Sequence, residues 1–299
     1  MPTVRNLSIL AIIGLLSGCG KPSLPSRAQS GDAVAQYEYG QKFLEGIGPE
    51  RDEEEAKNWL RKSAMQGYAP AQYLLARRLP VHSPERLELL TKAAGQEHTQ
   101  AVFDLSIIYE MGVSVPRDEV KSAALLEKWE KQADARDMLS LSYSYATGRE
   151  GMPMDSAKAF NWCTKAAEKG SIEAQFELGV MYSEGFNKVT KNAVSAVKWF
   201  RNAAGQGHAK AQYNLGVIFS GGRGVEQDFT EAYAWFNLAY TWSNLSYHSV
   251  SDADRLQAKA ARDELEKLLA PDLRVSGQKR AAELQKEIES NIAAKATGK

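Results

Sequence analysis

The sequence predicts an all-α fold, namely an α/α solenoid of about six helix-turn-helix repeats followed by C-terminal helices. The first observation is a motif that recurs about every 36 residues. Its clear copies are Ala35-Gln36-Tyr37, Ala71-Gln72-Tyr73, Ala174-Gln175-Phe176 and Ala211-Gln212-Tyr213, and weaker copies begin at Ala101 and Asp137. The second observation is that the copies are followed by two stretches of helical periodicity with a turn between them. A fixed period of this length indicates stacked supersecondary units and favours an extended binding surface.

The composition argues against one kind of partner. Hydrophobic residues make up 43% of the 299 residues, which is ordinary for a folded protein. Lysine and arginine together number 37 and are balanced by 37 aspartate and glutamate residues. Because phosphate binding needs an excess of positive charge, we expect no nucleic acid partner.

The first residues are typical of a secretory signal peptide, 1–18. Arg5 supplies positive charge, and residues 7–16 are almost wholly apolar but too few to span a bilayer. This run ends in a Leu-Ser-Gly-Cys segment that resembles the lipobox of bacterial lipoproteins. The resemblance implies that Cys19 is acylated, for example with palmitate, and anchors the protein in a membrane. An ordinary cleaved signal followed by a chance cysteine is the alternative.

The residues after the lipobox bear on where the protein resides. Gly20, rather than an aspartate, follows the cysteine, and by resemblance to the enteric sorting rule this implies the outer membrane rather than the inner one. Lys21 and Ser23 leave the choice of membrane open, since other bacteria also read later positions. Residues 19–32 contain two prolines and several serines, so we expect a disordered tether that reaches roughly 40 Å at full extension.

Each repeat is interpreted as two helices with distinct features. In the first helix Ala174 and Leu178 belong to one apolar stripe. The repeat position of Gly179 holds a small residue (glycine, alanine or serine) in every copy. A glycine inside a helix costs about 1 kcal/mol relative to alanine, so we expect a second helix to approach closely there. That second helix carries an apolar face, which includes Ala196 and Trp199 in the fifth unit. Its predicted capping residues are Asp52, Asp118, Asp155, Asn192 and Asp228, with Ser83-Pro84 in the shorter second unit.

The repeat pattern reads A-x-A-Q-Y-x-L-G-x-x-Y, then a glycine turn, then D-x-x-x-A-x-x-W-F-x-x-A-A-x-x-G. It resembles the Sel-one-like repeat (SLR), a relative of the tetratricopeptide repeat, over residues 33–242. The resemblance implies a right-handed superhelix with the first helices along its concave face, and a role in holding protein partners. Residues 251–292 are predicted to form helices that cap the last repeat, and a partner-binding arm is the other interpretation.

The sequence carries no recognised arrangement of catalytic or metal-binding residues. His98 and His208 occupy the same repeat position, and no histidines or cysteines have the spacing of a metal motif. Ser195 and Lys198 match the S-x-x-K motif of penicillin-recognising enzymes, but the other motifs of that class are missing. Cys163 has no disulfide partner if the lipobox cysteine is acylated, and we expect it to be a small buried residue. We therefore expect no enzyme activity, no cofactor, no metal and no small-molecule substrate.

The partner-binding residues are predicted from their position on the first helices. Counted from the leading alanine of each repeat, positions 4 and 7 face the concave side. The predicted residues are Ile107, Tyr143, Val180 and Val217 at position 7, and Glu177 and Asn214 at position 4. The position-7 residues would form an apolar strip along the groove, as protein-binding sites do. The alternative is that these side chains pack against the neighbouring repeat.

These expectations lead to a functional hypothesis. We expect a non-enzymatic, lipid-anchored solenoid that faces the periplasm and binds a protein. Among SLR lipoproteins one implied role is immunity, in which the solenoid neutralises a lipase-type effector delivered by type VI secretion. An assembly scaffold for an envelope or exopolysaccharide secretion complex is the alternative. A β-lactam-binding or cell-wall enzyme is a more remote one.

Overall fold

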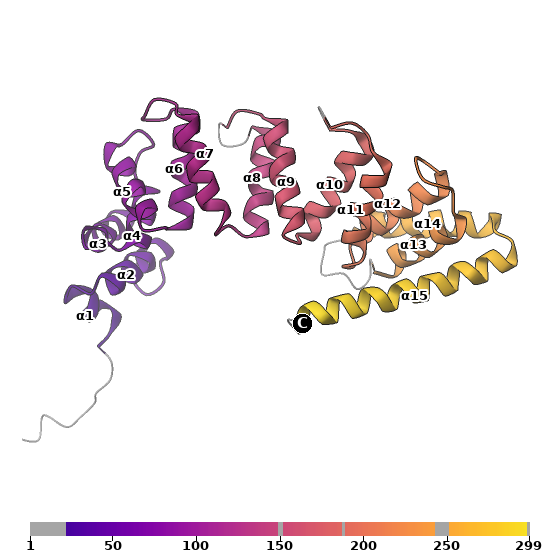
Figure 1. The fold of residues 1–299 in the computed structure, drawn as a ribbon. Helices are drawn as coiled ribbons and strands as arrows, with labels where there is room; N and C mark the ends of the chain where they lie inside the picture. The colour runs from indigo at the N-terminus through magenta and orange to yellow at the C-terminus, as the bar shows by residue number, and fades with distance from the viewer. Residues whose placement is uncertain (1–21, 149–151, 187–188, 243–250, 298–299) are drawn as a thin grey trace, which may run out of the picture. The chain divides into compact units, whose positions relative to one another are not determined.

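The computed structural model of the chain describes residues 22–148, 152–186, 189–242 and 251–297. The chain divides into two compact units, Met1–Trp129 and Glu130–Lys299. Every regular element in these ranges is an α-helix, and consecutive helices pack in pairs (Figure 1). The prediction of an all-α repeat solenoid is thereby confirmed. The predicted signal peptide, 1–18, and Cys19 lie outside the described residues.

The described part of the first unit contains seven helices. They are α1 (Leu24–Gln29), α2 (Ala33–Glu45), α3 (Glu53–Met65), α4 (Ala69–Ala76), α5 (Pro84–Gly95), α6 (Thr99–Met111) and α7 (Glu119–Glu130). Helix α2 packs against α3, and α4 packs against α5. The second helices α3 and α5 also contact the first helix of the following pair. Helix α6 meets α7 through the rings of Phe103 and Trp129, whose centroids lie 4.9 Å apart. The first three repeats therefore correspond to the pairs α2/α3, α4/α5 and α6/α7.

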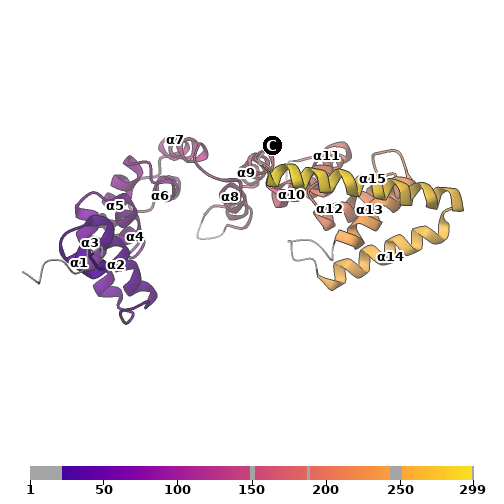
Figure 2. The same cartoon turned by 90° about the horizontal axis from the view of Figure 1, so that it is seen from below.

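The described part of the second unit contains eight helices. They are α8 (Ala135–Thr147), α9 (Ser156–Glu168), α10 (Ile172–Glu184), α11 (Ala193–Ala204), α12 (Ala209–Gly221), α13 (Phe229–Trp242), α14 (Asp252–Leu268) and α15 (Pro271–Ala296). The pairs α8/α9, α10/α11 and α12/α13 form the remaining repeats. Helix α13 also contacts α14 and α15, which lie on either side of it (Figure 2).

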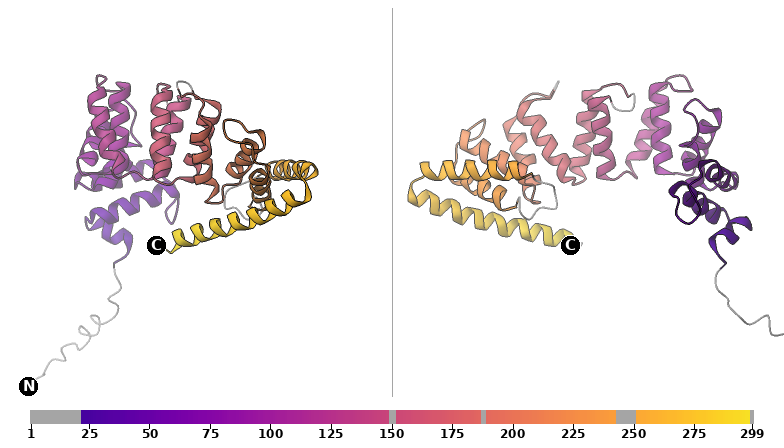
Figure 3. Two further views of the ribbon diagram at one scale, coloured as in Figure 1. Left: turned by 45° about the vertical axis from the view of Figure 1, so that its right-hand side comes forward. Right: turned by 180° about the vertical axis from the view of Figure 1, so that it is seen from behind.

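Helix α15 packs against α13, and its C-terminal part returns to the end of α11, where Lys295 bonds to Gln206 (Figure 3). Ala281, Leu284 and Ile288 on α15 belong to the same buried cluster as Phe200 of α11 and Trp235 of α13. This cluster joins two repeats and the C-terminal helix into one core. Among the described helices, none combines the length and the apolar composition that crossing a bilayer requires.

At Gly40, Gly179 and Gly216 the small residue of the first helix faces the second helix of its own repeat, as predicted. A Cβ atom at Gly179 would lie 2.6 Å from the ring of Phe200. A Cβ atom at Gly216 would lie 2.6 Å from the ring of Phe236. Carbon atoms separated so little repel each other strongly, since their optimal distance is about 3.5–4.0 Å. Close helix packing therefore explains why glycine occupies the middle of these helices.

The predicted helix caps are present, with one exception. Asp52, Asp118, Asp155, Asn192 and Asp228 each accept a hydrogen bond from a backbone N–H in the first turn of the second helix. Ser83 stands at the corresponding place before α5, but its side chain makes no capping hydrogen bond. Pro84 begins that helix, and its fixed φ angle suits the first helical position.

In four of the six repeats, a glutamine of the motif (Gln36, Gln72, Gln175 or Gln212) joins the repeat to the element before it. The side-chain amide of Gln72 donates to the carbonyl of Ala64, eight residues earlier, at 3.2 Å. Gln36 makes the same bond to Ala28 of α1, at 3.1 Å, and Ala28 is fully buried. Helix α1 therefore stands where the end of a preceding second helix would. The predicted disordered tether over 19–32 is wrong for α1, because packing against the first repeat orders that segment.

His98 caps α6, and we expect it to make the first unit less stable in acid. Its Nδ1 atom accepts from the backbone N–H of Ala101 at 3.4 Å, and its ring centroid lies 4.6 Å from that of Tyr73. Burial lowers the pKa of this imidazole. The unfolded chain therefore binds the proton first, so the stability is fully present above about pH 6.5 and falls as the pH drops below it.

Urea denaturation followed by circular dichroism at about pH 8 and about pH 5 measures this effect. The variant His98→Asn retains a capping oxygen that does not titrate. Its loss of unfolding free energy on acidification should be smaller than that of the wild type, because the asparagine oxygen remains an acceptor at both pH values. Equal losses in the two proteins would show that another group is responsible.

Candidate functional site

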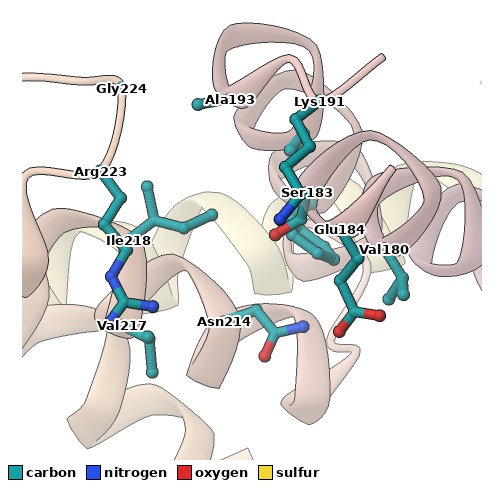
Figure 4. Close-up of a pocket in the computed structure, with 12 residues that line it drawn as sticks. Val180, Ser183, Glu184, Lys191, Ala193, Asn214, Val217, Ile218, Arg223 and Gly224 are labelled. Carbon is teal, nitrogen blue, oxygen red and sulfur yellow. The ribbon is translucent and has the colours of Figure 1, made fainter. Parts of the chain in front are cut away.

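The second unit contains a cavity of about 670 Å³ between α10, α11 and α12 (Figure 4). It is lined by Val180, Ser183, Glu184, Lys191, Ala193, Ala196, Phe200, Asn214, Val217, Ile218, Arg223 and Gly224. The apolar side chains come from the three helices, whereas the charged ones stand at the end of α10 and in the loops that follow α10 and α12. The volume is within the range of binding pockets, roughly 300–1,000 Å³.

Two glycines shape the loop that borders this cavity. Gly222 ends α12 in the left-handed conformation, with a φ angle of 58°, and turns the chain back. Gly224 then passes so close to the start of α11 that a Cβ atom on it would lie 2.5 Å from the Cβ of Ala193. Because Arg223 lies between the two glycines, this turn brings its side chain to the cavity.

Three of the six predicted partner-binding residues line the cavity. Val180 of α10 and Asn214 and Val217 of α12 come from consecutive repeats and meet at one hollow. Positions 4 and 7 of the first helices, which these residues occupy, are the ones predicted to face the concave side. Their role in partner binding stays a prediction.

The other three predicted residues are not among those that line it. Tyr143 of α8 is 43% exposed, and its hydroxyl donates to the Glu177 carboxylate at 3.1 Å. Burial and the adjacent carboxylate raise the pKa of this tyrosine. The two residues thus form a polar pair on neighbouring repeats. Ile107, on α6 of the first unit, is half-buried.

The two cavity valines also contact the protein core, which was the alternative interpretation of their positions. Val180 packs against the cluster that contains Phe200, and Val217 packs against the cluster that contains Tyr233 and Phe236. Both valines are half-buried. Each side chain therefore contributes one side to packing and another to the cavity, so replacing it affects folding as well as binding.

The charged residues of the cavity were missed at the level of the sequence. Glu184 ends α10, and Lys191 and Arg223 lie in loops, where helical periodicity gives no orientation. The two glycines that flank Arg223 were the available signal. They mark a tight turn, and a tight turn can bring the residue between them against the next helix.

Cys163 is buried, as the sequence predicts, and its thiol donates to the carbonyl of Ala174 at 3.5 Å. Burial and the Glu177 carboxylate raise the pKa of this thiol to about 12. At neutral pH it is therefore protonated and a poor nucleophile. Within the ranges that the structure describes, no three histidine, cysteine, aspartate or glutamate side chains are placed to hold a metal ion.

Comparison with known protein families identifies the repeats. The Sel1 repeat model matches residues 33–68, 99–134, 133–171, 172–208 and 209–241. These segments contain five of the six helix pairs. The remaining pair, α4/α5, contacts its neighbours in the same manner and carries the same glutamine bond.

Individual proteins are similar to parts of the chain. The chitin synthase regulator SKT5 of Saccharomyces cerevisiae is 29% identical over 126 residues, which are 39% of this chain and 18% of the regulator. The chain thus matches less than a fifth of that protein's length. Among solved structures, c5321, a protective antigen of uropathogenic Escherichia coli with an SLR fold, is 28% identical with a TM-score of 0.48. That alignment covers 92% of this chain and 58% of the antigen.

The immunity protein Pa5087 of Pseudomonas aeruginosa is 19% identical, with a TM-score of 0.29, over 72% of this chain and 83% of that protein. The family model, by contrast, matches more than half of this chain. Sel1 repeats mediate protein–protein interaction. The chain is therefore a protein-binding solenoid, and it belongs to the Sel1 repeat family.

Proposed function

We propose that this chain is a lipid-anchored, non-enzymatic immunity protein of the bacterial envelope that faces the periplasm. Its partner would be a lipase-type effector delivered by type VI secretion, which the solenoid neutralises by binding. The observation that carries the binding part is the cavity in the second unit, where Val180, Asn214 and Val217 from two consecutive repeats meet. Repeated side chains that converge on one hollow, with apolar walls and a charged rim, are typical of a protein-binding site.

The anchor part of the proposal is supported by the lipobox at Cys19 and by the position of α1. Four residues separate Cys19 from Leu24, the first residue of α1. A chain of this length spans no more than about 17 Å, which is less than half of the roughly 40 Å expected for a disordered tether over residues 19–32. An acylated Cys19 would therefore hold the first repeat close to the membrane, and we propose the outer membrane as its site. A toxin that attacks lipids acts at the same surface.

The mode of action follows from the binding surface. A rigid stack of helices can cover the active site of a toxin, or block its access to the bilayer, without breaking a bond. The proposal rests on the lipobox, the family and the cavity.

A competition assay tests this function. A strain that lacks the protein should lose viability and accumulate lysophospholipid when attacked by a strain with active type VI secretion, and the wild-type gene should restore survival. A variant with a cleavable signal peptide in place of residues 1–19 is released from the membrane. It should protect about tenfold less at equal abundance, because the anchor raises its local concentration at the surface.

The matched control is Cys163→Ala, which removes the other cysteine and should protect like the wild type. Normal survival of the deleted strain would contradict the immunity role. Loss of exported polysaccharide, without greater sensitivity to attack, would support an assembly scaffold instead. Full protection by the released variant would contradict the need for the anchor.

A further inference from the structure

Three polar side chains at the cavity have hydrogen-bonding groups that the fold does not use. They are Asn214 on α12, Arg223 in the loop after α12, and Glu184 at the end of α10. Across the described residues, no ion pair or hydrogen bond occupies any of the three side chains, and the two charged ones are exposed. Some charged groups of the unit are paired, as Arg201 and Arg280 are with Glu231. The cavity therefore offers unused polar groups to a ligand.

The arrangement of these groups has a direction. In Figure 4 the Asn214 amide lies between the Arg223 guanidinium on one side and the Glu184 carboxylate on the other. Val217 accompanies the arginine and Val180 lies near the glutamate. A ligand in this cavity thus meets a cation with an apolar neighbour at one end, an amide in the middle, and an anion with an apolar neighbour at the other end.

A third charged side chain, that of Lys191, also lines the cavity. Lys191 comes from the loop between α10 and α11, and it extends toward Ser183 (Figure 4). It gives the cavity a net charge of about +1, which adds some general attraction for acidic partners. It lies away from the line that joins the arginine, the asparagine and the glutamate, so it does not set the direction.

From this arrangement we propose that the cavity holds an extended segment of the partner protein in one fixed direction. A peptide group has one donor and one acceptor, and the Asn214 side chain has both in complementary form. An acidic partner residue would lie at Arg223 and a basic one at Glu184. This inference rests on the proposed function and specifies the chemistry of the partner.

An extended segment fits these groups better than a helix. In a helix the backbone N–H and C=O groups are already bonded within the helix, so none is left for the Asn214 amide. In an extended chain alternate residues project to opposite sides. Backbone groups and side chains on one side can then reach the amide, the two valines and the two charges together.

Selection from a phage-displayed library of short random peptides on the purified full chain tests the proposal. Enriched peptides should carry an acidic and a basic residue in one constant order. The same selection on the double variant Arg223→Glu, Glu184→Arg should enrich the reverse order, because the charges at the two ends are exchanged. The control Lys191→Gln should leave the order unchanged.

Binding constants of one synthetic enriched peptide, from isothermal titration calorimetry, complete the test. Asn214→Ala should weaken its binding about tenfold, which corresponds to one or two lost hydrogen bonds. Circular dichroism spectra of all variants should match that of the wild type, since the three side chains make no contact that the fold needs. Enriched peptides without a constant charge order would overturn the proposal, as would no enrichment at all. So would a peptide that binds the Asn214→Ala and charge-exchanged proteins as tightly as it binds the wild type.

The outcomes separate this inference from the proposed function. If the charge-exchanged variant protects cells as well as the wild type, the cavity is not the binding site although the immunity role stands. If the wild type fails to protect but selects peptides in one charge order, the immunity role is wrong although the cavity binds extended chains.

Discussion

Replacing Glu231 by alanine is expected to loosen α15 from the last repeat and to lower the free energy of unfolding by about 2–4 kcal/mol. The carboxylate of Glu231 accepts from Trp235 Nε1 at 3.0 Å, from Arg280 Nε at 2.9 Å and from Arg201 at 3.3 Å. Its side chain is only 10% exposed. Removing it leaves the buried indole N–H of Trp235 without its acceptor and takes a buried partner from both guanidinium groups.

Hydrogen exchange on the full chain measures this effect where it occurs. The amides of α15 should exchange about 30- to 1,000-fold faster in Glu231→Ala, because opening of that helix costs less free energy. The matched control is Glu283→Ala, which removes a half-exposed partner of the same arginine, 3.5 Å away. An exposed ion pair of that kind contributes about 0–1 kcal/mol. Unchanged protection of α15 in Glu231→Ala would mean that apolar packing alone holds the helix.

Replacing Gly179 by alanine is expected to destabilise the wild type by about 1–3 kcal/mol, although alanine is the better helix former. The added methyl group would stand 2.6 Å from the ring of Phe200, which is 1% exposed and cannot move aside freely. The sign should reverse when the ring is absent. In a Phe200→Ala background, Gly179→Ala should stabilise the protein by up to about 1 kcal/mol, because only the helix propensity remains.

Urea denaturation of the four proteins in this cycle gives the coupling between the two sites. Phe200→Ala alone is expected to cost about 3–5 kcal/mol, so mild conditions are needed to keep that background folded. The control substitution is Gly95→Ala, at a helical glycine with no neighbouring atom within 4 Å, and it should not destabilise. Gly179→Ala with the same effect in both backgrounds would refute the proposed contact.

The repeat period and the local rules of helix formation were enough to predict the fold class. Capping side chains bond to residues two or three positions away, so the aspartates before the second helices could be identified without tertiary information. The close approach of a second helix at Gly179 and Gly216 could also be predicted, because a glycine is unfavourable inside a helix unless tight packing requires it.

Tertiary packing decided features that no local pattern contains. Helix α1 has only six residues and two prolines lie in or beside it, so the sequence suggested a tether. It is ordered because Ala28 and the bond from Gln36 attach it to the first repeat. A short segment of this kind is helical through its contacts, since isolated helices of that length are unstable in water.

At the candidate site, too, the sequence predicts one part of the arrangement and tertiary packing decides the other. The sequence by itself determined which faces of α10 and α12 Val180, Asn214 and Val217 occupy, since helical periodicity fixes the direction of a side chain about its own axis. Only the tertiary structure decided that these faces meet at a cavity and that Arg223 and Glu184 stand at its ends. The physical reason is that loop conformation and the spacing of helices depend on contacts between distant residues, which no periodicity along the chain records.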